Sequence, residues 1–386
     1  MRTEFLPFHV PDIGEAEIAS VVDTLRSGWL TSGPKTAEFE SAFARYIGAE
    51  HAVAVNSCTA ALQLALAASG VGPGDEVIVP TMTFAATAEV IVHLGAVPVL
   101  VDSNPRDLTI ECGAVRDAIS PRTKAIVPVH YGGHPCDMDK LMDLARERGL
   151  AVVEDAAHAL PAHYKGRAIG TIGDFTCFSF YATKTLTTGE GGMITTDRTD
   201  QADRLRTLSL HGMSRQAWQR YTKEGDWYYE ILEVGYKFNM PALAAALGLP
   251  QLQRCDRLHQ IRSRLAGIYT EAFSRMAEIS LLSVSPEVQH AWHLYPILLN
   301  PDRLRIDRAG FIRALKRHNI GSSVHFIPLH LHPYYRDRYK YRPRDFPAAT
   351  QAYERLVSLP LYTQMSPGDV CDVIGAVAEV IRESRL

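Results

Sequence analysis

The chain has 386 residues, of which 46% are hydrophobic and 22% are charged, and its formal net charge is −3. This length favours a large domain with a smaller one, and the ordinary composition argues against both intrinsic disorder and a sustained basic surface for nucleic acid. No long uncharged apolar run occurs, which predicts a cytoplasmic protein without a membrane span.

Short β-branched runs alternate with helical patterns between residues 48 and 197. Strands are expected at 51–57, 75–80, 97–102, 124–131, 150–156, 174–180 and 191–196. Helices are expected between them at 59–69, 83–95 and 137–149. Strands separated by helices of this length are typical of βαβ units, so the pattern predicts an α/β fold whose mostly parallel seven-stranded sheet has helices on both faces.

The pattern changes after about residue 240. A long helical segment, 241–276, is basic on one face and could form a spine between two domains. Strand candidates at 290–299 and 322–328 and helices at 307–319 and 367–385 follow. We therefore predict a large α/β domain over residues 1–250 and a small α+β domain over residues 251–386.

Two residues are candidates for the chemistry of the site. Asp155 ends a hydrophobic strand, and Lys184 lies between a β-rich run and a cluster of glycines. Ligands of open parallel sheets bind at the carboxyl ends of the strands, where both residues are expected. A lysine that forms a Schiff base and an acid that keeps a pyridine nitrogen protonated are what pyridoxal phosphate needs most. Taken separately, Asp155 could instead cap a helix, and Lys184 could be an exposed loop residue.

Other residues near these strand ends could contact the same cofactor. The segment 56–62 (NSCTAAL) opens a helix after a strand, so its free N–H groups could hold a phosphate, although Ser57 or Thr59 could simply cap that helix. Ser179 precedes Lys184 by five residues, and a bend could bring its hydroxyl to the same phosphate. His158 could contact the cofactor ring or its 3′-oxygen, or it could be a half-buried structural histidine.

Cysteines and histidines do not indicate a metal site or a disulfide framework. The six cysteines form no Cys-x-x-Cys pair, which favours reduced thiols. Histidines gather at 130–136 and 325–332, but both segments adjoin proline and glycine turns and lack carboxylates at helical spacing. We expect no bound metal.

Eight segments together resemble the DegT/StrS-type nucleotide-sugar aminotransferases, a family of pyridoxal phosphate fold type I. The resemblance covers nearly the whole chain. It is carried, in family order, by residues 28–34, 56–62, 80–91, 129–139, 154–166, 179–193, 235–240 and 324–336. One departure follows Met240, where the family usually has Thr-Asp and this chain has Pro241 and Ala242. Proline suits a first helical turn, so a helix is still expected to begin there.

The resemblance implies a role for each matching residue. Lys184 would bind the cofactor and then move a proton between the amino donor and the cofactor, and Asp155 would pair with the pyridine nitrogen. The remaining cofactor contacts would come from Phe84 on the ring face, the Cys58 and Thr59 amides, and the Thr59 and Ser179 hydroxyls. Asn239 would reach the phosphate from a neighbouring subunit, so a homodimer with shared sites is expected. His325 and Thr31 would lie near the keto-sugar.

The same resemblance implies a reaction. L-Glutamate would convert the cofactor to pyridoxamine phosphate and leave as 2-oxoglutarate, and a nucleotide-linked 4-keto-6-deoxy sugar would then take the amine. Residues 129–139 favour C4 over C3. A C3-keto-sugar or cyclitol aminotransferase is the alternative within enzymes, and a non-catalytic regulatory relative is the alternative outside them. Lys184 itself favours transamination, because relatives that dehydrate sugars have histidine there. The nucleotide stays open.

Overall fold

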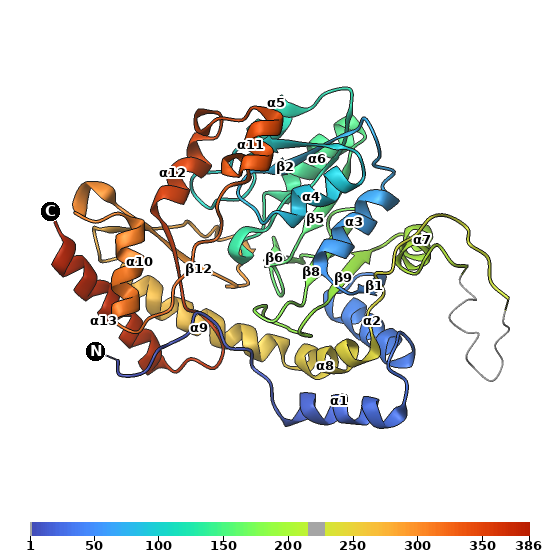
Figure 1. Cartoon of the computed structure of the whole chain (residues 1–386), viewed down its shortest axis with the longest axis horizontal. Helices are drawn as coiled ribbons and strands as arrows, with labels where there is room; N and C mark the ends of the chain where they lie inside the picture. Colours follow the sequence, from blue (N-terminus) through green and yellow to red (C-terminus); the bar gives the residue numbers. More distant parts are fainter. Residues whose placement is uncertain (1, 215–227) are drawn as a thin grey trace.

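The hydrophobic β-branched runs form one central sheet, as predicted. The computed structural model describes residues 2–214 and 228–386 (Figure 1). The sheet has the order β1-β9-β8-β5-β4-β2-β3, and its members pair in parallel except for β9, which is antiparallel to both neighbours. Its strands are β1 (His51–Val55), β2 (Glu76–Pro80), β3 (Val97–Val101), β4 (Thr123–Ile126), β5 (Ala151–Asp155), β8 (Phe175–Ser179) and β9 (Gly192–Thr196).

The reversed direction of β9 follows from the connection before it, which contains no crossover helix. A parallel crossover needs a dozen or more residues and usually a helix. Residues 180–191 contain turns and bends but no helix, and they return the chain beside β8 in the opposite direction. This connection carries Lys184.

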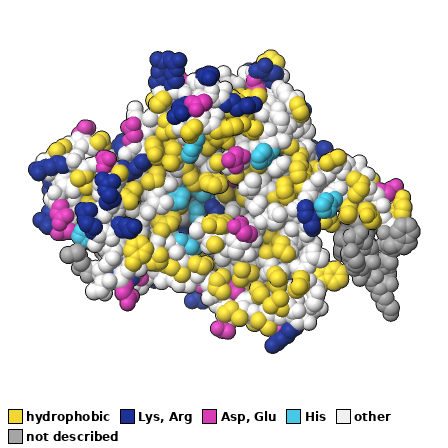
Figure 2. Space-filling view, viewed as in Figure 1, with side chains coloured by type: hydrophobic (Ala, Val, Ile, Leu, Met, Phe, Trp, Pro, Cys, Tyr) yellow, Lys and Arg dark blue, Asp and Glu magenta, His cyan; other side chains and the backbone are white. Residues whose placement is uncertain are grey.

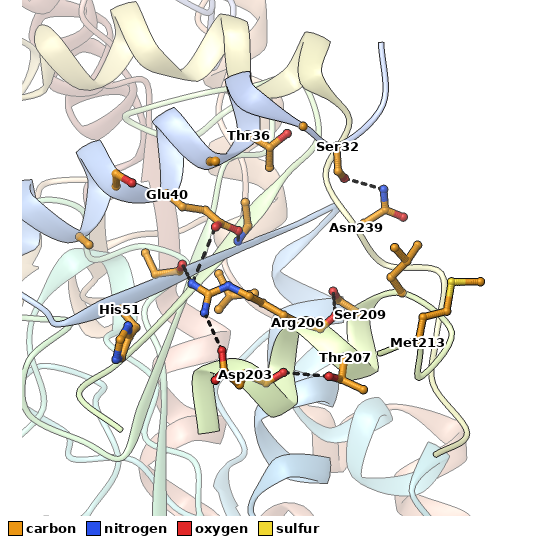
Figure 3. A pocket seen from close by; sticks show the side chains of 18 of the residues that line it. Ser32, Thr36, Glu40, His51, Asp203, Arg206, Thr207, Ser209, Met213 and Asn239 are labelled. Carbon is orange, nitrogen blue, oxygen red and sulfur yellow. Dashed lines mark hydrogen bonds and ion pairs between the residues drawn. The ribbon is translucent and has the colours of Figure 1, made fainter. Parts of the chain in front are cut away.

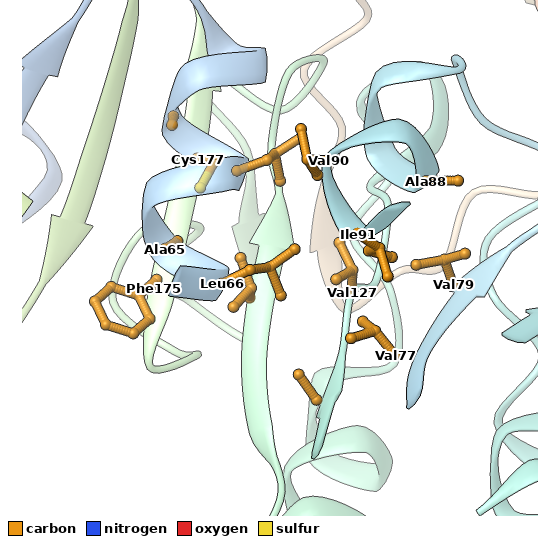
Figure 4. Close-up of a cluster of buried hydrophobic side chains, with 14 of the residues drawn as sticks. Ala65, Leu66, Val77, Val79, Ala88, Val90, Ile91, Val127, Phe175 and Cys177 are labelled. Carbon is orange, nitrogen blue, oxygen red and sulfur yellow. The ribbon is translucent and has the colours of Figure 1, made fainter. Parts of the chain in front are cut away.

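Helices cover both faces of the sheet because strand side chains alternate between two cores. Val77 and Val79 of β2 face one core, and Ile78 faces the other. Figure 4 shows the first core, where Leu66 and Ile91 pack over the strands. Its helices are α3 (Cys58–Ala68), α4 (Ala86–His93) and α7 (Thr199–Ser209). The second core is covered by α2 (Pro34–Ile47), α5 (Cys112–Ala118) and α6 (Met138–Arg148).

The predicted spine is two helices rather than one. Helix α8 (Ala242–Gln253) begins directly after its N-cap residue Pro241, and α9 (Cys255–Phe273) follows it across Arg254. Helix α8 packs on α1 (Glu15–Ser27) and α2. Figure 1 shows α8 and α9 running from the sheet to the C-terminal part of the molecule.

The C-terminal part has its own sheet and core. Strands β10 (Ile279–Leu281), β12 (Tyr295–Leu299) and β13 (Leu356–Leu359) form an antiparallel sheet in the order β10-β12-β13. The helices are α10 (Arg308–Arg317), α11 (Pro333–Tyr339), α12 (Pro347–Arg355) and α13 (Pro367–Ser384). Leu6 belongs to this core and bridges to Ile320. The division at residue 250 stays a prediction.

One predicted strand of this region is wrong. Residues 322–328 form no strand and make a single bridge, between Ser323 and Ser358. The place beside β12 is taken by β13, which the sequence pattern did not predict. Of the predicted strand 290–299, only the second half is a strand.

Short elements complete the fold. A three-stranded sheet has the order β11-β6-β7 and consists of β6 (His163–Tyr164), β7 (Arg167–Ala168) and β11 (Val288–Gln289). The 3₁₀ helices are η1 (Tyr131–Gly133), η3 (Pro301–Arg303), η4 (Leu329–Leu331) and η5 (Pro343–Asp345).

All six cysteines are free thiols. In residues 2–214 and 228–386, no helix could cross a membrane, and no cluster of three or more His, Cys, Asp or Glu side chains could hold a metal.

Candidate active site

A cavity of about 440 Å³ lies at the carboxyl ends of β5 and β8 and brings most of the predicted site residues together. Figure 2 shows a hollow near the middle of this face, where histidine side chains gather around a basic side chain. The sequence-predicted residues that line the cavity are Cys58, Thr59, Phe84, Asp155, His158, Ser179, Lys184 and His325. The α/β topology therefore places them where the sheet argument expects a ligand.

Lys184 is held in the cavity by its main chain, while its ammonium group is left without a partner in the described part of the chain. The Lys184 N–H donates to the carbonyl of Tyr181 at 2.9 Å, which closes a turn. Burial lowers the pKa of Lys184 from 10.5 to about 8, against the attraction of Asp155. Among the described residues, none makes a hydrogen bond or ion pair with its Nζ atom. A half-buried amine with a lowered pKa and no partner is available for nucleophilic attack.

Asp155 is buried at the end of β5 and has two donors. Its Oδ2 accepts from Thr87 Oγ1 at 2.8 Å, and its Oδ1 accepts from the Ala157 N–H at 3.1 Å. Burial nevertheless raises the pKa of Asp155 above its usual value, because these donors and Lys184 only partly offset the desolvation. A cationic N–H beside this carboxylate would reverse that shift. The bond to Ala157 also shows that Asp155 orders the turn after β5.

The start of α3 offers main-chain donors to the same cavity. Ser57 is the N-cap: its Oγ accepts from the Ala60 N–H at 3.1 Å. The amides of Cys58 and Thr59 have no acceptor in the part of the chain that the structure describes. A Cβ atom on Gly192 would lie 2.8 Å from the Cys58 nitrogen, so only glycine lets β9 pass this close. Free N–H groups at a helix start form an anion site suited to a phosphate.

His158 has a defined tautomer. Its Nδ1 accepts from the Gly132 N–H at 3.2 Å, so in the neutral ring the proton is on Nε2. Burial and the charge of Lys184 lower the pKa of His158 well below 6.5. The ring therefore presents a neutral donor to the cavity and does not serve as a cation.

Two aromatic residues and His325 form the outer wall. Phe84 is 62% exposed, with its ring 6.0 Å from that of Phe326. An exposed ring at a cavity mouth is suited to stack on a planar ligand. His325 Nδ1 lies 3.0 Å from Ser358 Oγ, and burial lowers the pKa of His325 to about 4.

Two predicted residues lie elsewhere in this chain. Asn239 lines a separate pocket, where its Nδ2 donates to Ser32 Oγ at 2.7 Å (Figure 3). Lys237 donates to Asn239 Oδ1. Thr31 is exposed and directly precedes Ser32. Neither Thr31 nor Asn239 lines the cavity of Lys184 in the same chain. This placement is the one expected for residues that act on the site of a second subunit.

The sequence reasoning missed several residues of the cavity, among them Thr87 and His293. Thr87 binds Asp155, and its position one helical turn beyond Thr83, with which it shares a hydrogen bond of 2.7 Å, could have indicated an inward face. His293 lines the cavity beside His158. No spacing signal pointed to His293, because it comes from the loop before β12.

Comparison with known proteins identifies the fold and its chemistry. A model of the DegT/DnrJ/EryC1/StrS aminotransferase family matches residues 11–378. The chain belongs to this family.

Relatives match over essentially their whole lengths. Spore coat polysaccharide biosynthesis protein SpsC of Bacillus subtilis is 53% identical over 382 residues, which cover 99% of this chain and 98% of SpsC. The Methanocaldococcus jannaschii protein MJ1066 is 52% identical over 385 residues, with 100% of both chains covered. Spr1654 of Streptococcus pneumoniae, assigned as a sugar aminotransferase, superposes with a TM-score of 0.92 at 37% identity and covers 98% of this chain and 99% of its own.

The protein is a pyridoxal phosphate-dependent sugar aminotransferase of fold type I. Spr1654 was solved in both PLP and PMP forms. The residues of this cavity fit the cofactor. Among the described residues, the Lys184 amine has no hydrogen-bond partner, the first amides of α3 have no acceptor, and Asp155 keeps a raised pKa that a cation in contact with it would lower. Each of these three unmet groups matches one group of pyridoxal phosphate, namely the aldehyde, the ring nitrogen and the phosphate.

The lowered pKa of Lys184 predicts how cofactor-free protein takes up pyridoxal phosphate. Only the neutral amine is a nucleophile, and below a pKa of about 8 its fraction falls as the pH falls. The rate of covalent capture should therefore rise by about tenfold per pH unit up to pH 8 and then level off. Stopped-flow absorbance from pH 6 to 10 measures this. Lys184→Ala corrects for surface lysines, and a plateau that begins only near pH 10 would contradict the lowered pKa.

Proposed function

We propose that the enzyme transfers the amino group of L-glutamate to a nucleotide-linked 4-keto-6-deoxy sugar and forms a 4-amino sugar. The observation that carries the proposal is the cavity itself, in which Lys184 and Asp155 lie among neutral histidines. SpsC, a relative across the whole chain, is named for polysaccharide biosynthesis, which supports a sugar acceptor. The similarity of residues 129–139 to the C4-acting branch favours C4 over C3.

Lys184 and Asp155 have different roles in the reaction: Lys184 transfers protons, and Asp155 acts on the ring nitrogen. When bound, pyridoxal phosphate supplies an electron sink for the charge that develops on the carbon next to the transferred nitrogen. Lys184 Nζ removes the proton from Cα of glutamate, and a pKa of about 8 keeps a useful fraction of this amine neutral near pH 7. In the second half-reaction the same atom would move a proton in the opposite direction, from the cofactor to the sugar carbon that receives the nitrogen. Asp155, held by Thr87 and Ala157, would keep the ring nitrogen protonated.

The start of α3 and the histidines set the orientation of the bound groups. The Cys58 and Thr59 amides, with the hydroxyls of Thr59 and Ser179, would hold the phosphate. Nε2–H of His158 would donate to the 3′-oxygen of the cofactor, because its Nδ1 is already engaged by Gly132. Phe84 would stack on the ring and exclude water.

A second subunit would complete the site. Asn239 lies in a separate pocket with Ser32, from which it would reach the phosphate of the neighbouring chain (Figure 3). Large apolar side chains on the segment before Asn239 support this: Ile231, Leu232 and Val234 are 57%, 61% and 93% exposed. Apolar side chains exposed to this degree on one segment are typical of an interface. Sedimentation analysis should give a dimer.

The decisive test uses the two half-reactions separately. The purified protein is first converted by L-glutamate to its pyridoxamine phosphate form, followed by loss of the pyridoxal phosphate absorption. UDP-, GDP- and dTDP-linked 4-keto-6-deoxyhexoses are then added one at a time, with 3-keto sugars and a cyclitol ketone as comparisons. Return of the absorption with a 4-keto sugar, and a 4-amino product by mass spectrometry and NMR, supports the proposal. Return only with a 3-keto sugar or the cyclitol would overturn it.

A further inference from the structure

The cavity contains a third inward-facing histidine in addition to His158 and His325. His293 is 8% exposed, lines the cavity and packs against His158, with ring centroids 4.4 Å apart at 36°. Burial and the charge of Lys184 lower its pKa well below 6.5, so the ring is neutral near pH 7.

The two ring nitrogens of His293 have different surroundings. Nδ1 is buried and has no hydrogen-bond partner among the described residues. Nε2 also has no such partner, but it is not buried, so it faces the cavity that the ring lines. An unmet acceptor is less costly to bury than an unmet donor, so the proton belongs on Nε2. His293 then presents a neutral N–H to a ligand.

Several hydrogen bonds hold the main chain around His293 and thereby set the direction of this donor. The Leu294 N–H donates to the Gly132 carbonyl at 3.1 Å, and the Ala291 N–H donates to the Gly133 carbonyl at 2.9 Å. Arg262, itself buried, donates from one guanidinium nitrogen to the carbonyl of Trp292 at 3.1 Å and to that of His293 at 3.4 Å. The same Gly132 donates to His158 Nδ1, so the two rings are positioned as a unit.

The charges of the cavity indicate which substrate oxygen this donor meets. Of the described residues that line it, Lys184 alone is cationic near pH 7, and Asp155 and Glu190 carry carboxyl groups. Carboxylates are bound most strongly by charged donors, so the uncharged His293 ring is not suited to bind the carboxylates of glutamate. A hydroxyl, by contrast, is matched by an uncharged N–H that leaves the Lys184 amine free to lose its proton.

We propose that His293 is a sugar-recognition residue whose Nε2–H donates a hydrogen bond to a hydroxyl group of the keto-sugar ring. The inference rests on the proposed function, because it needs the sugar to enter this cavity. It assigns to His293 a substrate contact made in the second half-reaction and not in the first.

Two substitutions separate recognition from packing. His293→Phe keeps a flat ring against His158 but removes the donor, whereas His293→Gln places an amide nitrogen near the position of Nε2. His293→Phe should lower kcat/KM for the sugar half-reaction about 10- to 100-fold, because the sugar hydroxyl is left without a partner. The glutamate half-reaction should change by less than about threefold. His293→Gln should recover a large part of the loss.

Stability provides an independent readout. Because Nδ1 is a buried acceptor without a partner, His293→Phe should melt at or above the temperature of the wild type while losing activity toward the sugar. The control is His93→Phe, since His93 is exposed at the end of α4 and does not line this cavity. It should leave both half-reactions at wild-type rates.

The outcomes distinguish the inference from the function it depends on. An unchanged sugar half-reaction in His293→Phe would show that the ring only packs, and equal losses in both halves would show that it acts on the shared chemistry. Either result overturns the inference and leaves the proposed function standing. A wild-type protein that rejects all three nucleotide-linked 4-keto sugars would overturn both.

Discussion

Replacement of Lys184 by alanine is expected to lower turnover by about 10⁴-fold or more. The variant loses both the amine that binds the cofactor and the base that moves the Cα proton, and no other side chain lining the cavity among the described residues can replace it. His158, His293 and His325 all have pKa values lowered by burial, which makes them weak bases. The measurements are absorbance of cofactor bound to lysine and the rate of the glutamate half-reaction.

Two further variants show whether the loss is specific. Lys184→Arg keeps the positive charge but cannot deprotonate near neutral pH, so it should be as inactive as Lys184→Ala. Lys140→Ala removes an exposed lysine whose partner is Asp137, and it should leave turnover unchanged. Normal transamination by Lys184→Ala would remove the basis for the assigned site.

The second large effect is expected at Asp155. Asp155→Asn leaves a ring-nitrogen cation without its buried anion, a change that costs about 3–5 kcal/mol in buried ion pairs. Turnover should therefore fall by about 10²- to 10⁴-fold. Without the cofactor the effect reverses: burial raises the pKa of Asp155, so the folded protein favours its neutral form. This stabilisation is present at low pH and is lost as the pH rises through the folded-state pKa. Cofactor-free Asp155→Asn should then be at least as stable as the wild type at pH 7, measured by denaturant unfolding.

Neighbouring substitutions provide matched controls. Thr87→Val keeps the carboxylate but removes one donor, so a smaller loss of about tenfold is expected. Glu154 is an equally buried acid on the preceding residue, but it points to the opposite face of β5, where it accepts from His130 at 2.8 Å. Glu154→Gln should reduce stability without changing the turnover of folded enzyme. An Asp155→Asn enzyme as active as wild type would show that the carboxylate does not act on the cofactor.

Local patterns predicted the elements of the large sheet because its strands are buried on both faces. Runs such as 76–80 are continuous and β-branched, and their boundaries are set by turn residues nearby. The C-terminal region was predicted less well. Residues 322–328 have strand-like composition, yet β13 occupies the ladder position beside β12, and such competition between two segments is not visible in either of them alone.

At the start of α3, the tertiary structure likewise decided a question that the sequence left open. The sequence left open whether Ser57 or Thr59 caps the helix. The structure assigns the cap to Ser57, which leaves the Thr59 hydroxyl and two amides for a ligand. That choice depends on the main-chain dihedral angles of Ser57 and on the close passage of Gly192, neither of which has a sequence signature.

The sequence by itself determined the fold class, because burial patterns are periodic, and it determined the cofactor through the resemblance of its motifs to one family. It also predicted Lys184 and Asp155 as the reacting pair. Only the tertiary structure decided the surroundings of that pair. It raised the pKa of Asp155 and lowered that of Lys184, since desolvation depends on atoms brought from distant segments. It also placed His293 in the cavity and Asn239 outside it, because those positions are set by how one part of the chain packs on another.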